Sequence, residues 1–231
     1  MPTKPTVVLV HGFWGDATHW AKVIVELRGR GFESIKAVEN PLTSLADDAA
    51  RTQQMIKQVD GPVLLVGHSY GGAVITEAGN LPNVVGLVYI AAFAPDAGES
   101  LATISARIAT PGGANVAPDS DGHLWIAQDA FQESFCQDLP DDEALVMAVT
   151  QKAPLGKANF DEVTDPAWRH KPTWYQVSTQ DRMIAPDTER WLANRMNPRK
   201  TVELDASHAS LASVPGAVVD LIETAVADLD L

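Results

Sequence analysis

Residues 61–79 read GPVLLVGHSYGGAVITEAG and contain three consecutive patterns. The apolar run Val63–Val66 has the length of a buried strand, the glycine-rich segment GHSYGG interrupts it, and the residues that follow are typical of a helix. Ser69 therefore stands on a sharp turn between a strand and a helix. Gly67 and Gly71 flank it at the G-x-S-x-G spacing, because such a turn leaves no room for side chains where strand and helix pass closely.

This turn is predicted to hold the Ser69 hydroxyl above the edge of a sheet. The helix that begins just after it brings free N–H groups and a positive dipole end to the same place. An oxyanion formed by attack of the serine on a carbonyl group would be stabilised there. The alternative is a glycine-rich turn with an incidental serine, which the strand before it and the helix after it disfavour.

Composition indicates one globular domain with an insertion. The 231 residues are 45% hydrophobic and 20% charged, which is enough to bury a sizeable core. Seventeen basic and thirty acidic residues give a net charge of −13, so nucleic acid and anionic membranes are disfavoured as partners and anionic substrates would be repelled. Cys136 is the single cysteine and can form no internal disulfide, which agrees with a cytoplasmic location.

Neither terminus nor interior carries a membrane signal. The N-terminal residues run straight into an apolar strand, without the charged, apolar and small-residue regions of a signal peptide. No apolar stretch approaches the length that spans a bilayer. We therefore expect a cytoplasmic protein without a membrane partner.

Apolar strands alternate with helical patterns along most of the chain, which favours an α/β fold. We expect a mainly parallel sheet of about six strands with helices on both faces. The alternation of strands and helices is interrupted from Pro95 to about Asp165, where glycine-rich turns and helical stretches indicate a mostly helical cap insertion. The division is then a core of residues 1–94 and 166–231 with a cap of residues 95–165. The expected strands are Val7–Val10, Glu33–Val38, Val63–Val66, Val84–Ile90, Thr173–Ser178 and Thr201–Leu204.

A serine nucleophile needs a base, and His208 is the best candidate. It follows the last expected strand, on a loop at the carboxyl edge where a parallel sheet gathers its chemistry. His68 adjoins Ser69, but neighbouring residues of a strand point to opposite faces, so we expect it to be packed. His11 ends the first strand and is expected to brace that turn.

For the acid that orients the base, Asp181 is favoured. It comes directly after the strand Thr173–Ser178, and the chain order of serine, acid and histidine is the one expected for this architecture. Asp96 is a serious rival because it also follows a strand. Asp187 is better explained as a helix N-cap after Pro186, and Asp205 is a further acid in the region.

The oxyanion is expected to be bound by two backbone N–H groups. Tyr70, just after the nucleophile, supplies one, and Phe13, after the first strand, supplies the other. Gly12 lets the chain pass close to the substrate, and Trp14 is a candidate substrate contact. Phe13 and Trp14 could equally pack in the core or under a lid.

Specificity is expected to lie in the cap. Trp125, Phe131 and Phe135 could line an apolar pocket, or the two phenylalanines could only attach the cap helix to the core. No cluster of Arg or Lys offers a carboxylate or phosphate clamp, so we expect small, neutral, moderately hydrophobic esters. Nothing in the spacing of Cys and His indicates a metal site.

These motifs resemble those of the α/β-hydrolase superfamily. The similarity runs through Val8 to Gly12, Gly67 to Gly72, Asp181 and His208, and it covers the chain apart from the cap. The segment Ala91–Asp96 is similar to the subgroup of plant methylesterases, hydroxynitrile lyases and small bacterial esterases. The resemblance implies acyl transfer to water without a metal or an organic cofactor.

Two residues that differ from those of the subgroup's hydroxynitrile lyases reduce the number of activities to consider. Hydroxynitrile lyases carry threonine where Gly12 stands and lysine where Ala209 stands, so cyanohydrin cleavage is disfavoured. We therefore expect a carboxylesterase-type serine hydrolase, present as a monomer or homodimer. The alternatives are a ligand receptor on the same fold, and a carbon–carbon bond hydrolase or lyase that uses the same triad.

Overall fold

The computed structural model describes residues 4–229 and 231. Residues 1–3, the start of the segment in which the sequence predicts no signal peptide, lie outside the described residues. Among the residues that are described, no helix combines the length and apolar character needed to cross a bilayer.

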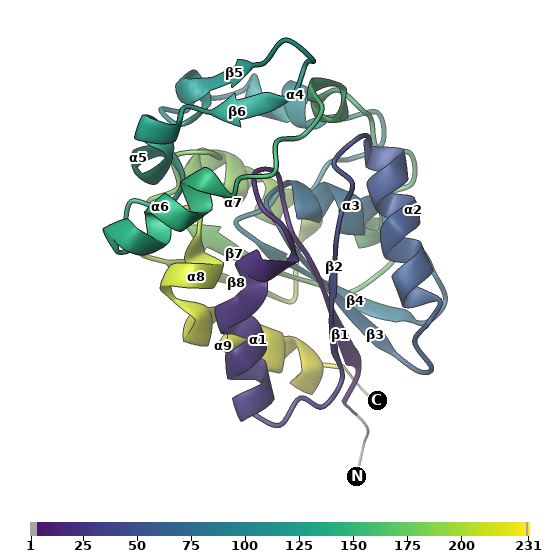
Figure 1. The fold of residues 1–231 in the computed structure, drawn as a ribbon. Coiled ribbons are helices and arrows are strands. Elements are labelled where there is room, and N and C mark those ends of the chain that lie inside the picture. The colour runs from purple at the N-terminus through teal and green to yellow at the C-terminus, as the bar shows by residue number, and fades with distance from the viewer. Residues whose placement is uncertain (1–3, 230) are drawn as a thin grey trace.

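Six strands form one parallel sheet, in the order β2-β1-β3-β4-β7-β8 (Figure 1). This confirms the expected fold class and the six strands that the sequence predicts. The two central strands that carry the most apolar runs, β1 and β3, are buried throughout, whereas the outer strands β2 and β8 expose alternate residues, as edge strands do. The strands are β1 (Thr6–Val10), β2 (Ile35–Val38), β3 (Val63–His68), β4 (Val84–Ile90), β7 (Thr173–Ser178) and β8 (Lys200–Leu204).

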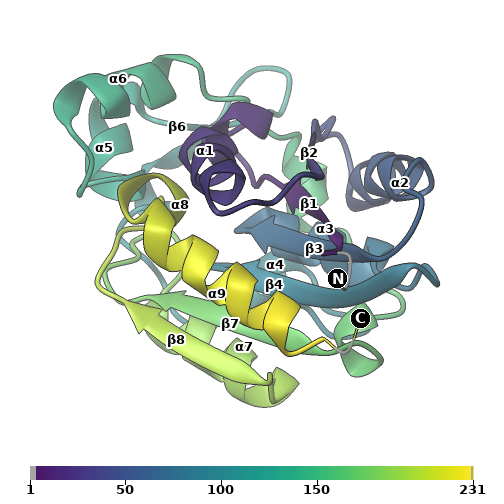
Figure 2. The ribbon, with the colours of Figure 1, turned by 90° about the horizontal axis from the view of Figure 1, so that it is seen from below.

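Helices cover both faces of the sheet. Helices α1 and α9 pack against each other on one face, and α2 packs against α3 on the other (Figure 2). Right-handed crossovers require this arrangement, because the chain moves outward from β1 to β2 and then back to β3. The helices are α1 (Ala21–Gly29), α2 (Leu45–Ile56), α3 (Tyr70–Ala78), α4 (Leu101–Ser105), α5 (Phe131–Phe135), α6 (Asp141–Val149), α7 (Pro186–Met196), α8 (Ser210–Ser213) and α9 (Pro215–Ala227).

The helix that precedes the nucleophile strand begins where the sequence predicts. The Ser44 side chain accepts a hydrogen bond from the amide of Asp47 at 3.1 Å and so caps the N-terminus of α2. The first turn also carries Asp47 and Asp48, whose charges suit that end of the helix.

All six strands end at one edge of the sheet, and β1 and β3 are neighbours with β2 outside β1. Val10 pairs with Gly67 in register, and Ser178 pairs with Leu204. The loops that follow these strands therefore converge at the point where the strand order reverses, which is where open α/β sheets bind ligands.

The cap segment, residues 95–165, lies above this edge in Figure 1. It holds α4, α5 and α6 together with a small antiparallel hairpin of β5 (Val116–Pro118) and β6 (Leu124–Ile126), which the sequence analysis did not anticipate. Backbone hydrogen bonds join it to the core, among them one from Leu155 to Leu42 at 2.9 Å. Short 3-10 helices complete the described chain at Ala17–Trp20, Gly113–Asn115, Gln128–Ala130, Gly156–Asn159 and Ala167–Arg169.

Candidate active site

Ser69 lies on the turn between β3 and α3 in a conformation that non-glycine residues rarely adopt. Its φ of 56° and ψ of −125° are unfavourable for a side chain with a Cβ atom, and such strain is concentrated at functional sites. Backbone hydrogen bonds hold it in place: the Ser69 amide donates to Ile90 at 3.3 Å, and the Ser69 carbonyl accepts from Phe93 at 3.1 Å. The hydroxyl is thus presented at a fixed point above the sheet.

The glycines that flank Ser69 are required because neighbouring backbone atoms leave no room for a Cβ atom at either position. A Cβ atom on Gly67 would lie 2.5 Å from the Gly71 carbonyl oxygen, and one on Gly71 would lie 2.3 Å from the Val10 carbonyl oxygen. The strand and the helix of the turn therefore pass closely, as the glycine spacing predicts, and β1 also passes against the turn.

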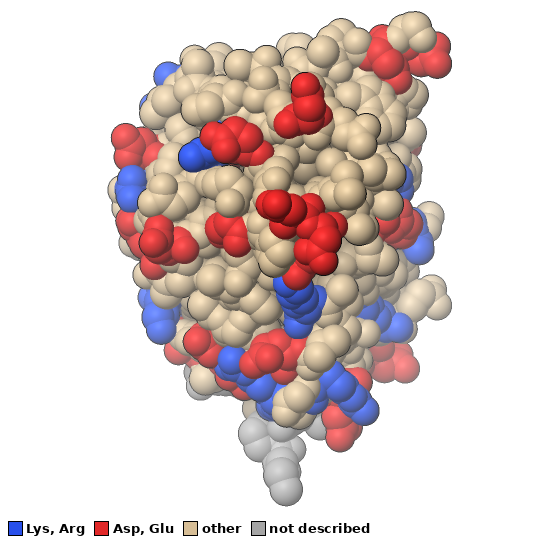
Figure 3. All heavy atoms as spheres, turned by 60° about the vertical axis from the view of Figure 1, so that its left-hand side comes forward, with Lys and Arg blue, Asp and Glu red and all other residues tan. Residues whose placement is uncertain are grey.

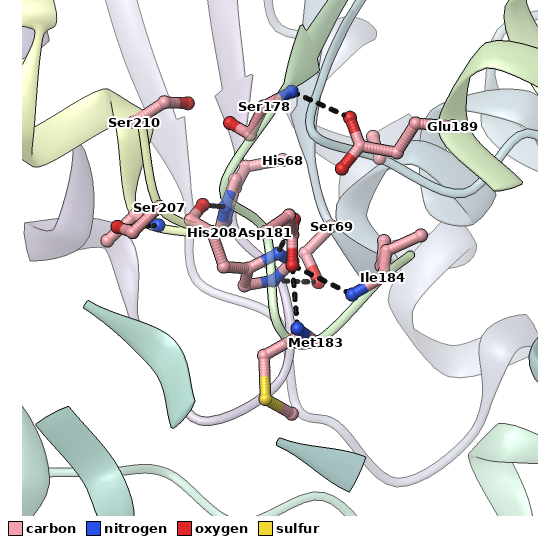
Figure 4. A network of polar contacts seen from close by, with 12 residues as sticks. His68, Ser69, Ser178, Asp181, Met183, Ile184, Glu189, Ser207, His208 and Ser210 are labelled. Carbon is pink, nitrogen blue, oxygen red and sulfur yellow. Dashed lines mark hydrogen bonds and ion pairs between the residues drawn. The ribbon is translucent and has the colours of Figure 1, made fainter. Parts of the chain in front are cut away.

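His208 lies between Ser69 and Asp181 and is fully buried (Figure 4). Its Nε2 is 2.8 Å from Ser69 Oγ, and its Nδ1 is 2.5 Å from Asp181 Oδ2. The other carboxylate oxygen of Asp181 accepts the amide hydrogens of Met183 and Ile184 at 2.7 and 2.8 Å. Because a carboxylate only accepts, Nδ1 carries the proton and Nε2 is free to accept from the serine hydroxyl.

The rival acids are placed elsewhere. Asp96 pairs with Arg169 at 2.5 Å, and Asp205 accepts a hydrogen bond from the Gln180 side chain at 3.0 Å. Asp187 is not the N-cap of α7: the helix begins at Pro186 with Ala185 as the N-cap, and Asp187 lies in the first turn. The structure brings Asp181, and none of these three, to His208.

Two aromatic rings pack around the imidazole of His208. His68 is buried, as expected, and its Nε2–H donates to the His208 carbonyl at 2.8 Å. Burial, reinforced by the nearby His208, holds the pKa of His68 well below its usual value, so this ring is neutral. The Phe135 ring meets His208 edge to face at a centroid distance of 4.8 Å. The hydrogen bond from His68 and the packing of Phe135 hold His208 in position.

The amides of Phe13 and Tyr70 donate no hydrogen bond to any other described residue. The two side chains stack, with ring centroids 4.0 Å apart and an angle of 21° between the planes. His11 braces the same loop: its Nδ1–H donates to the Gly12 carbonyl at 2.8 Å, and its Nε2 accepts the amide hydrogen of Asn40 at 3.0 Å. The loop after β1 is therefore held on both sides, with its Phe13 amide unpaired.

Trp14 joins this loop to the cap segment. Its backbone adopts a φ of 60°, its amide donates to the Lys152 carbonyl at 3.1 Å, and its indole N–H donates to the Leu124 carbonyl at 2.9 Å. The side chain is nearly buried between core and cap.

A cavity of about 230 Å³ opens beside Ser69. Its walls are mostly apolar, and none of its lining residues is charged. It lies between the core loops and the cap segment. The lining residues are Phe13, Trp14, Ser69, Phe93, Leu101, Ser105, Thr110, Gly113, Val116, Leu124, Asn159, Met183 and Ile184.

The three cap aromatics for which the sequence predicts substrate contact do not line this cavity. Trp125 is 40% exposed and its indole N–H donates to Asp119 at 2.9 Å, because alternate residues of β6 face opposite sides and Leu124 takes the inward position. Phe131 and Phe135 are fully buried and stack on each other at 5.1 Å. They attach the cap to the core.

Two buried acids near the site escaped the sequence analysis. Glu189 on α7 accepts the Ser178 amide hydrogen at 2.9 Å, and burial together with the nearby Asp181 charge holds its pKa well above the usual value. Asp48 on α2 accepts a hydrogen bond from the Tyr70 hydroxyl at 2.6 Å. A carboxylate on the apolar face of α2, one turn from Leu45 and Thr52, was the signal available for Asp48.

A model of the alpha/beta hydrolase family matches residues 7–221. The chain belongs to this family. This alpha/beta hydrolase is 25% identical over 240 residues to the probable hydrolase R7 of a Phoma species, with 95% of this chain and 97% of that protein covered. It is 22% identical over 232 residues to methylesterase 2 of Arabidopsis thaliana, with 87% and 88% covered.

Solved structures share the fold at low sequence identity. A pyrethroid hydrolase from Sphingobium faniae superposes with a TM-score of 0.80 at 18% identity, over 97% of this chain and 98% of the other. The resemblance to the alpha/beta hydrolases that the sequence predicts is thus confirmed, and it extends over the cap segment as well as the core.

Proposed function

We propose that this alpha/beta hydrolase is a serine esterase that cleaves carboxylic esters through an acyl-enzyme on Ser69. The observation that carries the proposal is the unbroken series from Ser69 Oγ to His208 to Asp181, with distances of 2.8 and 2.5 Å, at the wall of a cavity. Relatives named as a hydrolase and a methylesterase support the reaction class.

In the first step, Ser69 Oγ attacks the ester carbonyl carbon while His208 Nε2 takes the hydroxyl proton. The amides of Phe13 and Tyr70, which donate to no other described residue, would donate to the oxyanion. Asp181 keeps the imidazole in the tautomer with Nδ1–H and stabilises the imidazolium that forms. The imidazolium then gives its proton to the alcohol oxygen, which leaves as the C–O bond breaks.

In the second step, water repeats the sequence on the acyl-enzyme. His208 Nε2 removes a proton from the water as its oxygen bonds to the acyl carbon, and the same two amides hold the new oxyanion. The bond to Ser69 Oγ then breaks, and the serine recovers the proton from His208. The products are a carboxylic acid and an alcohol, and no metal or organic cofactor takes part in the proposed mechanism.

The substrates we propose are small, neutral, moderately hydrophobic esters. The cavity of about 230 Å³ has a mostly apolar lining, with Ser105, Thr110 and Asn159 as its polar members besides Ser69. No charged group of the lining could pair with a substrate carboxylate or phosphate. Acidic side chains are scattered over the face that carries α5 and α6, with few basic ones in its upper half (Figure 3), and the net charge of −13 would repel anions.

The test is hydrolysis of short-chain p-nitrophenyl esters, with labelling by a fluorophosphonate probe in parallel. We expect Ser69→Ala to abolish both, whereas the matched control Ser120→Ala, which alters an exposed loop serine, should abolish neither. A wild-type protein that is folded yet neither hydrolyses nor is labelled would refute the proposal and favour a ligand receptor instead.

A further inference from the structure

Asp48 is a buried carboxylate that the proposed reaction does not use. Its side chain is inaccessible to solvent, and none of its hydrogen bonds within the described residues comes from a lysine or an arginine. Oδ2 accepts from the Tyr70 hydroxyl at 2.6 Å, and Oδ1 accepts from the Leu42 amide at 2.8 Å. Burial raises the pKa of Asp48 to about 6. Burying a carboxylate without a bonded cation lowers the stability of the fold, so we looked for a role that its two hydrogen bonds serve.

The first of these hydrogen bonds leads to the nucleophile turn. Tyr70 directly follows Ser69, and its backbone amide is one of the two proposed oxyanion donors. Its hydroxyl is held by Asp48, and the face of its ring stacks on Phe13, whose amide is the other donor, with the two ring centroids 4.0 Å apart. A single side chain, anchored at its hydroxyl by Asp48, thus spans the gap between the two loops that supply the donors.

The second hydrogen bond leads to the cap segment. Leu42 adopts a left-handed φ of 62°, which is unfavourable for a branched side chain, and Asp48 holds its amide in that conformation. The Leu42 carbonyl in turn accepts the amide hydrogen of Leu155 at 2.9 Å. Asp48 therefore fixes a contact between core and cap in addition to the nucleophile turn.

We propose that Asp48 is a positioning residue for the oxyanion-binding amides, acting through the Tyr70 hydroxyl and the stack of Tyr70 on Phe13. This inference rests on the proposed esterase function of Ser69. Asp48 touches no reacting atom. Its effect is to keep the amides of Phe13 and Tyr70 at the separation that a tetrahedral oxyanion requires.

Tyr70→Phe is the sharpest test, because it keeps the stacked ring and removes only the hydroxyl. We expect kcat for a p-nitrophenyl ester to fall about tenfold, less than the loss from deleting a donor, while KM stays unchanged. The affinity for a trifluoromethyl ketone, which forms a tetrahedral adduct with the serine, should fall by the same factor as kcat/KM. Asp48→Asn should behave alike, and the double variant should lose no more than the worse single variant.

Tyr89→Phe is the matched control. Tyr89 on β4 is also a buried tyrosine with a bonded hydroxyl, 2.9 Å from Thr76 Oγ1 of α3, but among the described residues this hydroxyl contacts neither Asp48 nor the loop after β1. We expect it to lower the thermal unfolding temperature and to leave kcat/KM and ketone affinity unchanged. This separates loss of stability from loss of oxyanion binding.

The outcomes distinguish this inference from the proposed function. Wild-type hydrolysis that Ser69→Ala abolishes upholds the esterase, and unchanged kcat/KM and ketone affinity in Tyr70→Phe would then overturn the role of Asp48 alone. Absence of hydrolysis in the wild type overturns both. If Asp48→Asn fails to fold, Tyr70→Phe still decides the question.

Discussion

Gly12→Ala tests how closely the loop after β1 approaches the nucleophile. A Cβ atom on Gly12 would lie 2.7 Å from Ser69 Cβ, 2.9 Å from the His68 carbonyl oxygen and 3.1 Å from Ser69 Oγ. Ordinary contacts begin at 3.4 Å, so the nucleophile and the loop after β1 must separate by several tenths of an ångström. Misplacement on the scale of 1 Å costs roughly a hundredfold in rate, so we expect kcat to fall between tenfold and about a hundredfold.

The assay for Gly12→Ala combines ester hydrolysis with urea unfolding. Because Ser69 is held by backbone hydrogen bonds on both sides, the strain should also lower the free energy of unfolding by about 1–3 kcal/mol. Gly29→Ala is the control, since a Cβ atom at that position meets nothing within 4 Å. Wild-type kcat and wild-type stability in Gly12→Ala would refute the close approach on which the site geometry depends.

Three further predictions follow from the contacts of the site. Asp181→Asn should lower kcat about 10⁴-fold by disturbing the imidazole tautomer, whereas Asp96→Asn should leave kcat unchanged, and equal losses in ester assays would contradict the choice of acid. The raised pKa of Asp48 adds about 3 kcal/mol to the free energy of unfolding below pH 4, and this contribution is lost as pH rises through 6. In Asp48→Asn the free energy of unfolding, measured in urea, should therefore depend less on pH between 4 and 6. An unaltered dependence would count against the buried carboxylate. Trp14→Phe removes the hydrogen bond to Leu124 and should speed amide hydrogen exchange in β6, with unchanged exchange as the opposing result.

The strands of the sheet could be predicted because the decisive signals are local. The strands β1 and β3 are short apolar runs that end in glycine and histidine, and the glycines around Ser69 indicate close backbone approach directly in the sequence. The positions of His208 and Asp181 followed from the parallel sheet, since residues after parallel strands meet at one edge.

The cap was harder to predict because its elements are short and half exposed. The strands β5 and β6 contain three residues each, too few to show alternation, so nothing in the sequence indicated that Leu124 faces the cavity and Trp125 faces solvent. Phe131 and Phe135 follow helical spacing whether they line a pocket or attach a helix. In the structure both side chains are absent from the cavity lining and Phe135 packs against His208, which separates the two interpretations.

The pKa of a buried acid depends on neighbours that the sequence does not reveal, as Glu189 shows. Asp181 and Glu189 both lie beside Ser178: Glu189 accepts its amide hydrogen at 2.9 Å, and the Asp181 amide donates to its carbonyl at 3.2 Å. The Asp181 carboxylate accepts two amide hydrogens at Oδ1 and contacts His208 Nδ1 through Oδ2. Glu189 receives one amide hydrogen, and its pKa is held well above the usual value by burial and by Asp181. Burial therefore holds Glu189 in its neutral form, so this neighbour adds no negative charge beside the carboxylate that faces His208.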